Sequence, residues 1–299
     1  MKELLFSGAG TALITPFDKE GNIQWEELEQ LVEFQIENGI DAIIACGTTG
    51  EASTMTAEEH LKTIEFIIQK AHGRVPVIAG TGSNNTQHSV DLSLEAKRLG
   101  ADGLLLVTPY YNKTSQKGLE EHYSYIADSV KMPCILYNVP ARTGVNIQPA
   151  TYQKLSKNPY IVAAKEANGD VSSVARTLAL CGEDLTVYSG DDSQTLPIIA
   201  LGGMGVISVF SNALPRQMHD LAAAVLEGDL ETARELNSDF VDLFDSFTLD
   251  VNPIPIKEAL YRMGKISTDF CRMPLTTMSE DNIQKLLSIL KRHDIPVIG

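Results

Sequence analysis

Residues Ile161-Val162-Ala163-Ala164-Lys165 form an apolar run that ends in a lysine. The run predicts a strand that is buried on both faces, as in a parallel sheet. Lysine is rarely fully buried without a partner, and burial favours its neutral form. A neutral amine can attack a carbonyl carbon and form a Schiff base. Lys165 is therefore a candidate covalent catalyst, and a buried ion pair is the alternative interpretation.

Seven other short, nearly continuous apolar runs are spaced along the chain, with segments of helical periodicity between them. The eight runs cover residues 11–14, 41–46, 75–80, 103–108, 133–137, 161–165, 185–189 and 205–210. Strands alternating with helices to a count of eight predict an α/β fold, the (β/α)8 TIM barrel. A doubly wound open sheet is the alternative.

The pattern changes after residue 212. The remaining segments have helical periodicity, over residues 214–226, 230–247, 256–263 and 281–291. We expect a catalytic barrel at residues 1–212 and a C-terminal helical extension at residues 213–299. No low-complexity linker separates the two parts, so the extension should pack on the barrel.

Composition limits the classes of partner. The chain of 299 residues carries 24 Lys and Arg against 39 Asp and Glu, a net charge of −15, which argues against a nucleic-acid partner. No apolar stretch reaches the ~18 residues that span a bilayer, and the N-terminus lacks a signal-peptide core. Cys46 and Cys134 lie in apolar runs and are expected to be reduced, which favours a cytoplasmic location. The histidines show no paired ligand spacing, so we predict no metal.

Polar residues follow the ends of several runs, where a barrel places its active site. Tyr137 ends the run before that of Lys165, and adjacent strands lie ~4.8 Å apart, so its phenol could transfer protons near the amine. The turn Gly47-Thr48-Thr49-Gly50 offers hydroxyl and backbone N–H donors to a carboxylate or phosphate. Arg142 could hold a carboxylate through two hydrogen bonds. A core tyrosine, an ordinary glycine turn and a surface arginine are the alternatives.

Four motifs occur in the same order in a known family. They are GTTGE at 47–51, TPYYNK at 108–113, YNVPARTG at 137–144 and VAAKEA at 162–167. Together they resemble the pyruvate-dependent class I aldolases of the N-acetylneuraminate lyase family, over essentially the whole chain. The resemblance implies a covalent imine between Lys165 and pyruvate, with no external cofactor.

Two residues are similar to one branch of that family. Arg142 in YNVPARTG and Tyr111 in TPYYNK resemble the branch that condenses pyruvate with L-aspartate 4-semialdehyde to 4-hydroxy-tetrahydrodipicolinate. That reaction is the first committed step of diaminopimelate and lysine biosynthesis. The alternatives are a sister lyase acting on sialic acid, a keto-deoxy sugar acid or 4-hydroxy-2-oxoglutarate, and a barrel that only binds a keto acid as a sensor.

The resemblance also implies roles for individual residues. Lys165 would form the Schiff base, and Tyr137 would donate and accept protons. Thr48 and Tyr111 would extend the proton relay, with Tyr111 supplied by the neighbouring subunit of a homotetramer built from two dimers. The residues implied to bind substrate are Thr49, Arg142, Gly190 and Ile207.

A regulatory lysine site in some relatives is only partly matched here. The corresponding positions are Ala52, Ala57, His60, Asn84, His88 and Tyr110. Asn84, Tyr110 and His60 fit the resemblance. Ala52 and Ala57 replace a serine and a histidine, and His88 replaces a glutamate that would hold the ammonium group. We predict weak or absent inhibition by L-lysine.

Overall fold

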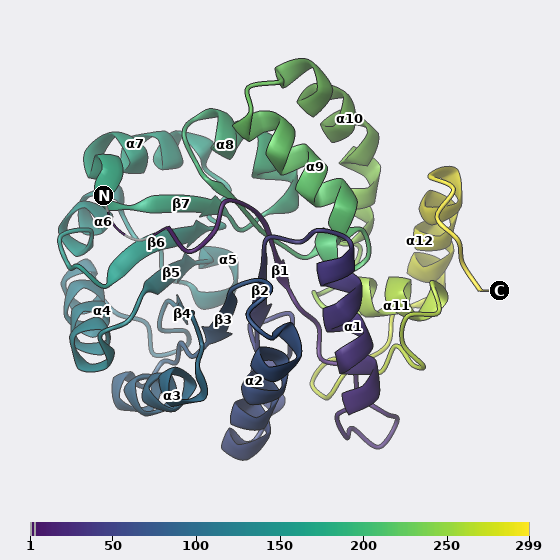
Figure 1. The fold of residues 1–299 in the computed structure, drawn as a ribbon, viewed down its shortest axis with the longest axis horizontal. Helices are drawn as coiled ribbons and strands as arrows, with labels where there is room; N and C mark the ends of the chain where they lie inside the picture. Colours follow the sequence, from purple (N-terminus) through teal and green to yellow (C-terminus); the bar gives the residue numbers. More distant parts are fainter. Residues whose placement is uncertain (1, 3, 299) are drawn as a thin grey trace.

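The computed structural model describes residue 2 and residues 4–298, and a closed barrel of parallel strands forms its centre (Figure 1). Each strand pairs with the next along the chain, and the last pairs with the first. The strands are β1 (Gly8–Ala12), β2 (Ala42–Ala45), β3 (Val77–Gly80), β4 (Gly103–Val107), β5 (Cys134–Asn138), β6 (Ile161–Glu166), β7 (Thr186–Ser189) and β8 (Gly205–Ser208). The predicted TIM barrel is confirmed, and the doubly wound sheet is excluded.

Helices α1 to α8 lie between successive strands along the chain, and α9 to α12 follow the last strand (Figure 1). They are α1 (Trp25–Glu37), α2 (Ala57–Ala71), α3 (Thr86–Leu99), α4 (Gln116–Val130), α5 (Pro140–Thr143), α6 (Pro149–Leu155), α7 (Val171–Cys181), α8 (Thr195–Ala200), α9 (Pro215–Leu226), α10 (Leu230–Ser246), α11 (Ile254–Arg262) and α12 (Glu280–Arg292). Short 3-10 helices cover Ala52–Thr54, Gly182–Asp184, Asp192–Gln194 and Phe210–Asn212.

Side chains fill the barrel interior. Phe6, which precedes β1, stacks on Tyr188 of β7 with ring centroids 4.3 Å apart. The Tyr188 hydroxyl donates to the Phe6 carbonyl oxygen at 2.7 Å. This aromatic pair fills the interior near the start of β1, whereas the cavity described below is lined by residues at the other end, where the strands terminate.

The first strand lies earlier than predicted, at Gly8–Ala12 and not at residues 11–14. Glycines hide it from the sequence pattern, because they break the apolar run that identifies the other strands. Gly10 also leaves room for two neighbouring side chains. A Cβ on Gly10 would lie 2.8 Å from Cδ1 of Ile44 and 2.9 Å from Cζ of Phe6.

The predicted boundary at residue 213 separates one barrel helix from the barrel. Helix α9 packs on β1 and β8 and lies beside α8, so it occupies the position of the eighth barrel helix. By these contacts α9 belongs with the barrel helices, and the division of the chain at residue 213 stays a prediction. Periodicity alone could not assign α9, because it shows that a helix is amphipathic but not which surface it covers.

The extension is anchored to the barrel by aromatic and cationic side chains. Phe210, which follows β8, contacts Phe240 and Phe244 of α10 with centroid distances of 5.4 and 5.1 Å. The Lys265 ammonium, beyond α11, lies 4.1 Å from the ring centroid of Phe34 in α1. Figure 1 shows α10, α11 and α12 along one side of the barrel, next to α9 and α1. The linker between α10 and α11 reaches the barrel mouth, as described below.

Candidate active site

Lys165 lies near the end of β6 and is buried, with 5% of its surface exposed. Its backbone is the register partner of Tyr137 on β5, at the same height in the barrel, as the sequence predicted. The ammonium nitrogen lies 4.3 Å from the centroid of the Tyr137 ring. Burial lowers the pKa of Lys165 to about 8, with the Asp192 carboxylate opposing that shift and the Arg142 guanidinium adding to it. A substantial fraction of neutral amine therefore exists near pH 8.

Glu166, the next residue, faces the other side of the strand and does not neutralise Lys165. Its carboxylate accepts hydrogen bonds from Asn138 Nδ2 at 2.9 and 3.1 Å and from the Tyr152 hydroxyl at 3.0 Å. Burial raises the pKa of Glu166 to about 7. This arrangement confirms that Glu166 is not the ion-pair partner of Lys165.

Tyr137 is buried and lines the cavity at the barrel mouth. Burial raises the pKa of its phenol to about 12. The hydroxyl is therefore protonated at neutral pH and can donate a proton before it accepts one. Its place between the cavity and the Lys165 amine suits a group that transfers protons to and from a molecule attached to that amine.

The turn at Gly47–Gly50, which we call the carboxylate turn, follows β2 at the same rim. Thr48 is exposed and lines the cavity, whereas Thr49 is buried. The Glu51 N–H donates to the Thr48 carbonyl oxygen at 3.1 Å and closes the turn. The two adjacent threonines therefore differ in exposure, and Thr48 is the one among the residues that line the cavity.

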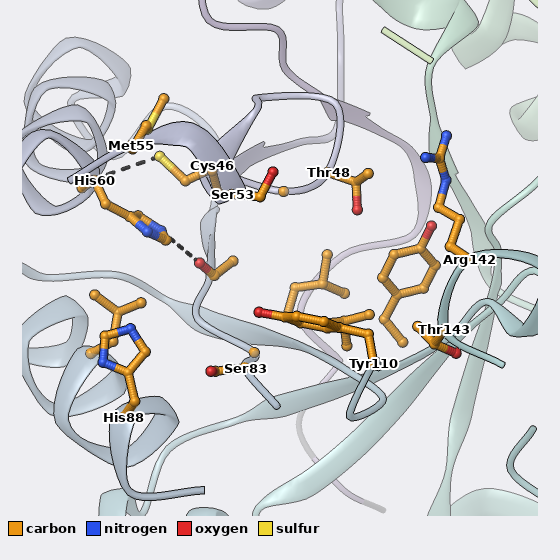
Figure 2. A pocket seen from close by; sticks show the side chains of 18 of the residues that line it. Cys46, Thr48, Ser53, Met55, His60, Ser83, His88, Tyr110, Arg142 and Thr143 are labelled. Carbon is orange, nitrogen blue, oxygen red and sulfur yellow. Dashed lines mark hydrogen bonds between the residues drawn. The ribbon is translucent and has the colours of Figure 1, made fainter. Parts of the chain in front are cut away.

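Arg142 is on the single-turn helix α5, which follows β5. Its guanidinium is exposed at the cavity, at the same end as Thr48 (Figure 2). Nη2 donates to the carbonyl oxygen of Asn252 at 3.4 Å. The remaining N–H groups can bind an anionic ligand through two hydrogen bonds.

Gly190 and Ile207 complete the surroundings of Lys165. A Cβ on Gly190 would lie 3.0 Å from Cγ and 3.1 Å from Cε of Lys165, so the glycine makes room for the lysine stem. Ile207 is buried in the interior cluster that contains Tyr137. Gly190 therefore shapes the space around Lys165, and Ile207 packs in the apolar cluster that includes Tyr137.

Tyr111 has a different setting. It is 92% exposed and has a positive φ of 68°. The side chain projects from the loop after β4 and is not among the residues that line the cavity within one chain. The Tyr111 side chain is therefore free of the cavity wall in this single chain.

The cavity, of about 470 Å³, continues from the barrel mouth into a second lobe beneath α2 and α3. Figure 2 shows Thr48 and Arg142 at one end and His60 and His88 at the other. His60 Nε2 donates to the Gly80 carbonyl oxygen at 2.8 Å, and burial lowers the pKa of His60. Ala52, Ala57, Ser53, Met55 and Tyr110 also line the cavity.

Asn84 lies at the edge of this lobe and fixes the loop that carries Tyr110. Its Nδ2 donates to the Tyr110 carbonyl oxygen at 3.2 Å, and its own carbonyl oxygen accepts from Asn112 Nδ2 at 2.9 Å. None of the described residues that line the cavity is an aspartate or glutamate. The cavity wall thus provides histidines and hydroxyls but no carboxylate for an ammonium ligand.

The sequence did not identify two residues of the rim. Asn252, between α10 and α11, donates from Nδ2 to the Thr49 hydroxyl oxygen at 3.0 Å. Asp192, after β7, accepts hydrogen bonds from the N–H groups of Val209 and Phe210 at 3.1 and 2.9 Å. Burial raises the pKa of Asp192. For Asn252, the only signal in the sequence is an asparagine before a proline in an interhelical loop. That pattern indicates a turn and does not point to a substrate-binding role.

Other features of the described chain bear on ligands and environment. All four cysteines, Cys46, Cys134, Cys181 and Cys271, are buried free thiols. Within residue 2 and residues 4–298, no three His, Cys, Asp or Glu side chains are grouped as metal ligands would be. Over the same residues, no helix has the length and apolarity needed to cross a bilayer.

A family model, curated sequences and solved structures all identify relatives of the same kind. A model of the dihydrodipicolinate synthetase family matches residues 5–293. The 4-hydroxy-tetrahydrodipicolinate synthase of Acetivibrio thermocellus is 49% identical over 295 residues, which cover 99% of this chain and 100% of the relative. The crystal structure of dihydrodipicolinate synthase from Aquifex aeolicus has a TM-score of 0.96 and 46% identity, covering 98% of this chain and 100% of that one. The crystal structure of DHDPS from Cyanidioschyzon merolae with lysine bound has a TM-score of 0.94 and 36% identity. The match covers 98% of this chain and 100% of that one.

Proposed function

The chain belongs to the dihydrodipicolinate synthetase family, and from this membership we propose that it condenses pyruvate with L-aspartate 4-semialdehyde to give 4-hydroxy-tetrahydrodipicolinate. The enzyme is a lyase of the class I aldolase type and serves diaminopimelate and lysine biosynthesis. The observation that carries this proposal is the buried Lys165 amine, which lies on the Tyr137 ring at the mouth of a closed barrel.

The first stage is imine formation. The neutral Lys165 amine attacks the ketone carbon of pyruvate, a C–N bond forms, and the ketone oxygen leaves as water. Tyr137 supplies and recovers the protons that this exchange requires. No external cofactor is needed, because the protonated imine itself withdraws electrons from the adjacent methyl group.

The second stage builds the product. Loss of a methyl proton from the imine gives an enamine, whose carbon attacks the aldehyde carbon of the semialdehyde. The semialdehyde amine then attacks the imine carbon, closes the six-membered ring and displaces the Lys165 amine. The lysine is regenerated, so it is a covalent catalyst and not a reactant.

Two anion-binding groups orient the substrates. Thr48 and Thr49 in the carboxylate turn hold the carboxylate of pyruvate, with the free backbone N–H groups of the turn. Arg142 holds the carboxylate of the semialdehyde. Gly190 and Ile207 border the pyruvate side, where Gly190 leaves space for the lysine stem.

Tyr111 completes the proton relay from a neighbouring subunit. Its exposure of 92% and its place at a loop tip suit a side chain that reaches into a partner. Thr48 connects this phenol to Tyr137. We infer a homotetramer made of two such dimers, and light scattering should give the molar mass of four chains.

The working location that we propose is the cytoplasm. Four buried free thiols suit a reducing compartment.

L-Lysine should inhibit the enzyme weakly or not at all. The positions that would form a lysine site are Ala52, His60, Asn84, His88 and Tyr110, and the cavity wall lacks a carboxylate for the ammonium group of the ligand. Steady-state rates should be unchanged by micromolar L-lysine and reduced little by millimolar L-lysine. Inhibition by micromolar lysine would contradict this prediction.

The reaction is tested by substrate competition. With pyruvate present, turnover of L-aspartate 4-semialdehyde should greatly exceed cleavage of sialic acid, 2-keto-3-deoxygluconate or 4-hydroxy-2-oxoglutarate. The sister lyases would share Lys165 and Tyr137, but the relatives named above favour the synthase. Faster turnover of any of these sugar or oxo acids would replace the proposed function with a lyase.

A further inference from the structure

The carboxylate turn is held from behind by the C-terminal extension. Asn252 Nδ2 donates to the Thr49 hydroxyl oxygen at 3.0 Å, across 203 positions of sequence. Because that oxygen accepts from Asn252, the hydroxyl proton of Thr49 is left free to donate to another acceptor. The backbone carbonyl oxygen of Asn252 accepts a hydrogen bond from Arg142 Nη2 at 3.4 Å. Asn252 thus contacts both anion-binding groups of the proposed site.

A buried ion pair holds the other end of the turn. Glu51, which follows Gly50 directly, pairs with Lys257 of α11, and the two side chains are 1% and 0% exposed. The Lys257 ammonium also donates to the Phe270 carbonyl oxygen at 2.9 Å and lies 4.3 Å from the Phe17 ring centroid. Both charges are therefore enclosed, and each depends on the other.

Arg272 joins this cluster from the segment after α11. Its backbone N–H donates to the second carboxylate oxygen of Glu51 at 2.9 Å. Its guanidinium donates to the Glu59 carboxylate at 2.6 and 3.0 Å and to the Thr54 carbonyl oxygen at 3.0 Å. We call Glu51, Lys257 and Arg272 the buried ion cluster.

The backbone at Glu51 explains why the turn needs such support. Glu51 has a φ of 55°, in the left-handed region that non-glycine residues rarely adopt. Such a conformation persists only where surrounding contacts determine it. A buried ion pair contributes little net stability compared with an apolar pair of the same volume, but it fixes where its two partners lie.

We propose that Asn252 and the buried ion cluster are positioning residues for the first substrate, and that the C-terminal extension sets the affinity of the carboxylate turn for the pyruvate carboxylate. The proposal rests on the proposed function. Asn252 directs the Thr49 hydroxyl, and the cluster fixes the backbone of the turn. Loss of either should raise the pyruvate concentration that half-saturates the enzyme while kcat at saturation changes less.

Asn252 gives the more direct test. Asn252→Ala removes the hydrogen bond, and Asn252→Asp keeps the shape but loses the donor. Both full-length variants should need about tenfold more pyruvate for half-maximal borohydride-trapped adduct, the effect of one lost hydrogen bond near a charged ligand. The matched control is Asn282→Ala in α12, because Asn282 also donates a hydrogen bond from Nδ2, in its case to the Leu249 carbonyl oxygen at 2.9 Å within the extension. It should behave as wild type.

The ion cluster is tested with charge-balanced variants, because Lys257→Met alone would leave Glu51 buried and unpaired. Glu51→Gln/Lys257→Met removes both charges and should also raise half-saturating pyruvate by about tenfold. Glu258→Gln/Arg262→Met is the matched control, since this pair on α11 has an N–O distance of 2.7 Å and does not contact the turn. Circular dichroism should show that both double variants are folded. If the cluster variant does not fold, the two Asn252 variants still decide.

The outcomes separate this proposal from the function on which it rests. Absence of any adduct in the wild-type enzyme would overturn the proposed function. A wild-type adduct, with half-saturating pyruvate unchanged in Asn252→Ala and Asn252→Asp, would overturn only the positioning role. An Asn252→Asp variant that matches wild type while Asn252→Ala does not would show that Asn252 merely fills space.

Discussion

Lys165 and Lys257 are both buried, and each ammonium lies 4.3 Å from the centroid of an aromatic ring, Tyr137 for one and Phe17 for the other. They differ in their anionic partners. Lys257 pairs directly with Glu51, whereas among the described residues no carboxylate is within 4.0 Å of the Lys165 ammonium. Burial alone therefore does not make a lysine reactive. A paired lysine remains a charged structural group, and an unpaired buried one has its proton destabilised.

The largest difference between the two lysines should be in catalysis. Lys165→Ala removes the nucleophile, so kcat should fall by about 10⁴-fold or more, as when other enzymes lose a nucleophile. Glu51→Gln/Lys257→Met should keep most of its kcat at saturating pyruvate. Steady-state rates of the two purified variants make this comparison. Substantial turnover by Lys165→Ala would show that the unpaired lysine is not the catalyst.

Tyr137→Phe should have the next largest effect. The ring that contacts Lys165 remains, but the hydroxyl that transfers protons is lost, so kcat should fall by about 10²–10⁴-fold. The apolar packing around Lys165 should be unchanged, and thermal melting should therefore resemble that of wild type. Wild-type activity would leave Tyr137 as a packing residue only, like Phe17 beside Lys257.

Stability should change in opposite directions at the two sites. Lys165→Met should raise the free energy of unfolding at pH 7 by about 3 kcal/mol, from the lowering of the Lys165 pKa from 10.5 to about 8. Lys257→Met should lower it by about 3–5 kcal/mol, because Glu51 would remain buried without its partner. Denaturant titrations of both variants measure the two changes. Destabilisation by Lys165→Met would mean that its amine has a stabilising partner.

The pH dependence of the stability effect follows from the sign of the shift. The folded pKa of Lys165 lies below its unfolded value, so the penalty for burying the ammonium is complete below about pH 8. It decreases between about pH 8 and pH 10.5 and is absent above. The advantage of Lys165→Met should therefore disappear at high pH. If Lys165→Met raised the free energy of unfolding by the same amount at every pH, the gain would come from packing and not from the loss of the buried charge.

The smallest predicted effect is the pH profile of catalysis. With a Lys165 pKa of about 8, the neutral fraction rises about tenfold between pH 7 and pH 9, and kcat/KM for pyruvate should rise with it. The same profile in Glu51→Gln/Lys257→Met should keep its midpoint, since Lys257 does not react. If the midpoint of the pH profile of kcat/KM moved in this double variant, the charges at Glu51 and Lys257 would be shown to influence the Lys165 pKa.

The sequence predicted Lys165 and its environment but not Lys257. An apolar run ending in lysine, next to a run ending in tyrosine, is a local signal, and strand alternation then fixes their relative height. The partners Glu51 and Lys257 are 206 positions apart, and Asn252 and Thr49 are 203 apart. No local pattern records such contacts, because they arise only when the extension folds back onto the barrel. β1 was misplaced for a related reason, since close packing against Ile44 and Phe6 selects a glycine at residue 10.

Peptide mapping of the borohydride-reduced pyruvate adduct tests most directly whether pairing decides reactivity. The wild-type enzyme should carry one adduct per chain, on the peptide that contains Lys165, and the peptide that contains Lys257 should be unmodified at any pyruvate concentration. Lys165→Ala should carry none. An adduct on Lys257, or none on Lys165, would contradict the assignment of Lys165 as the Schiff-base lysine.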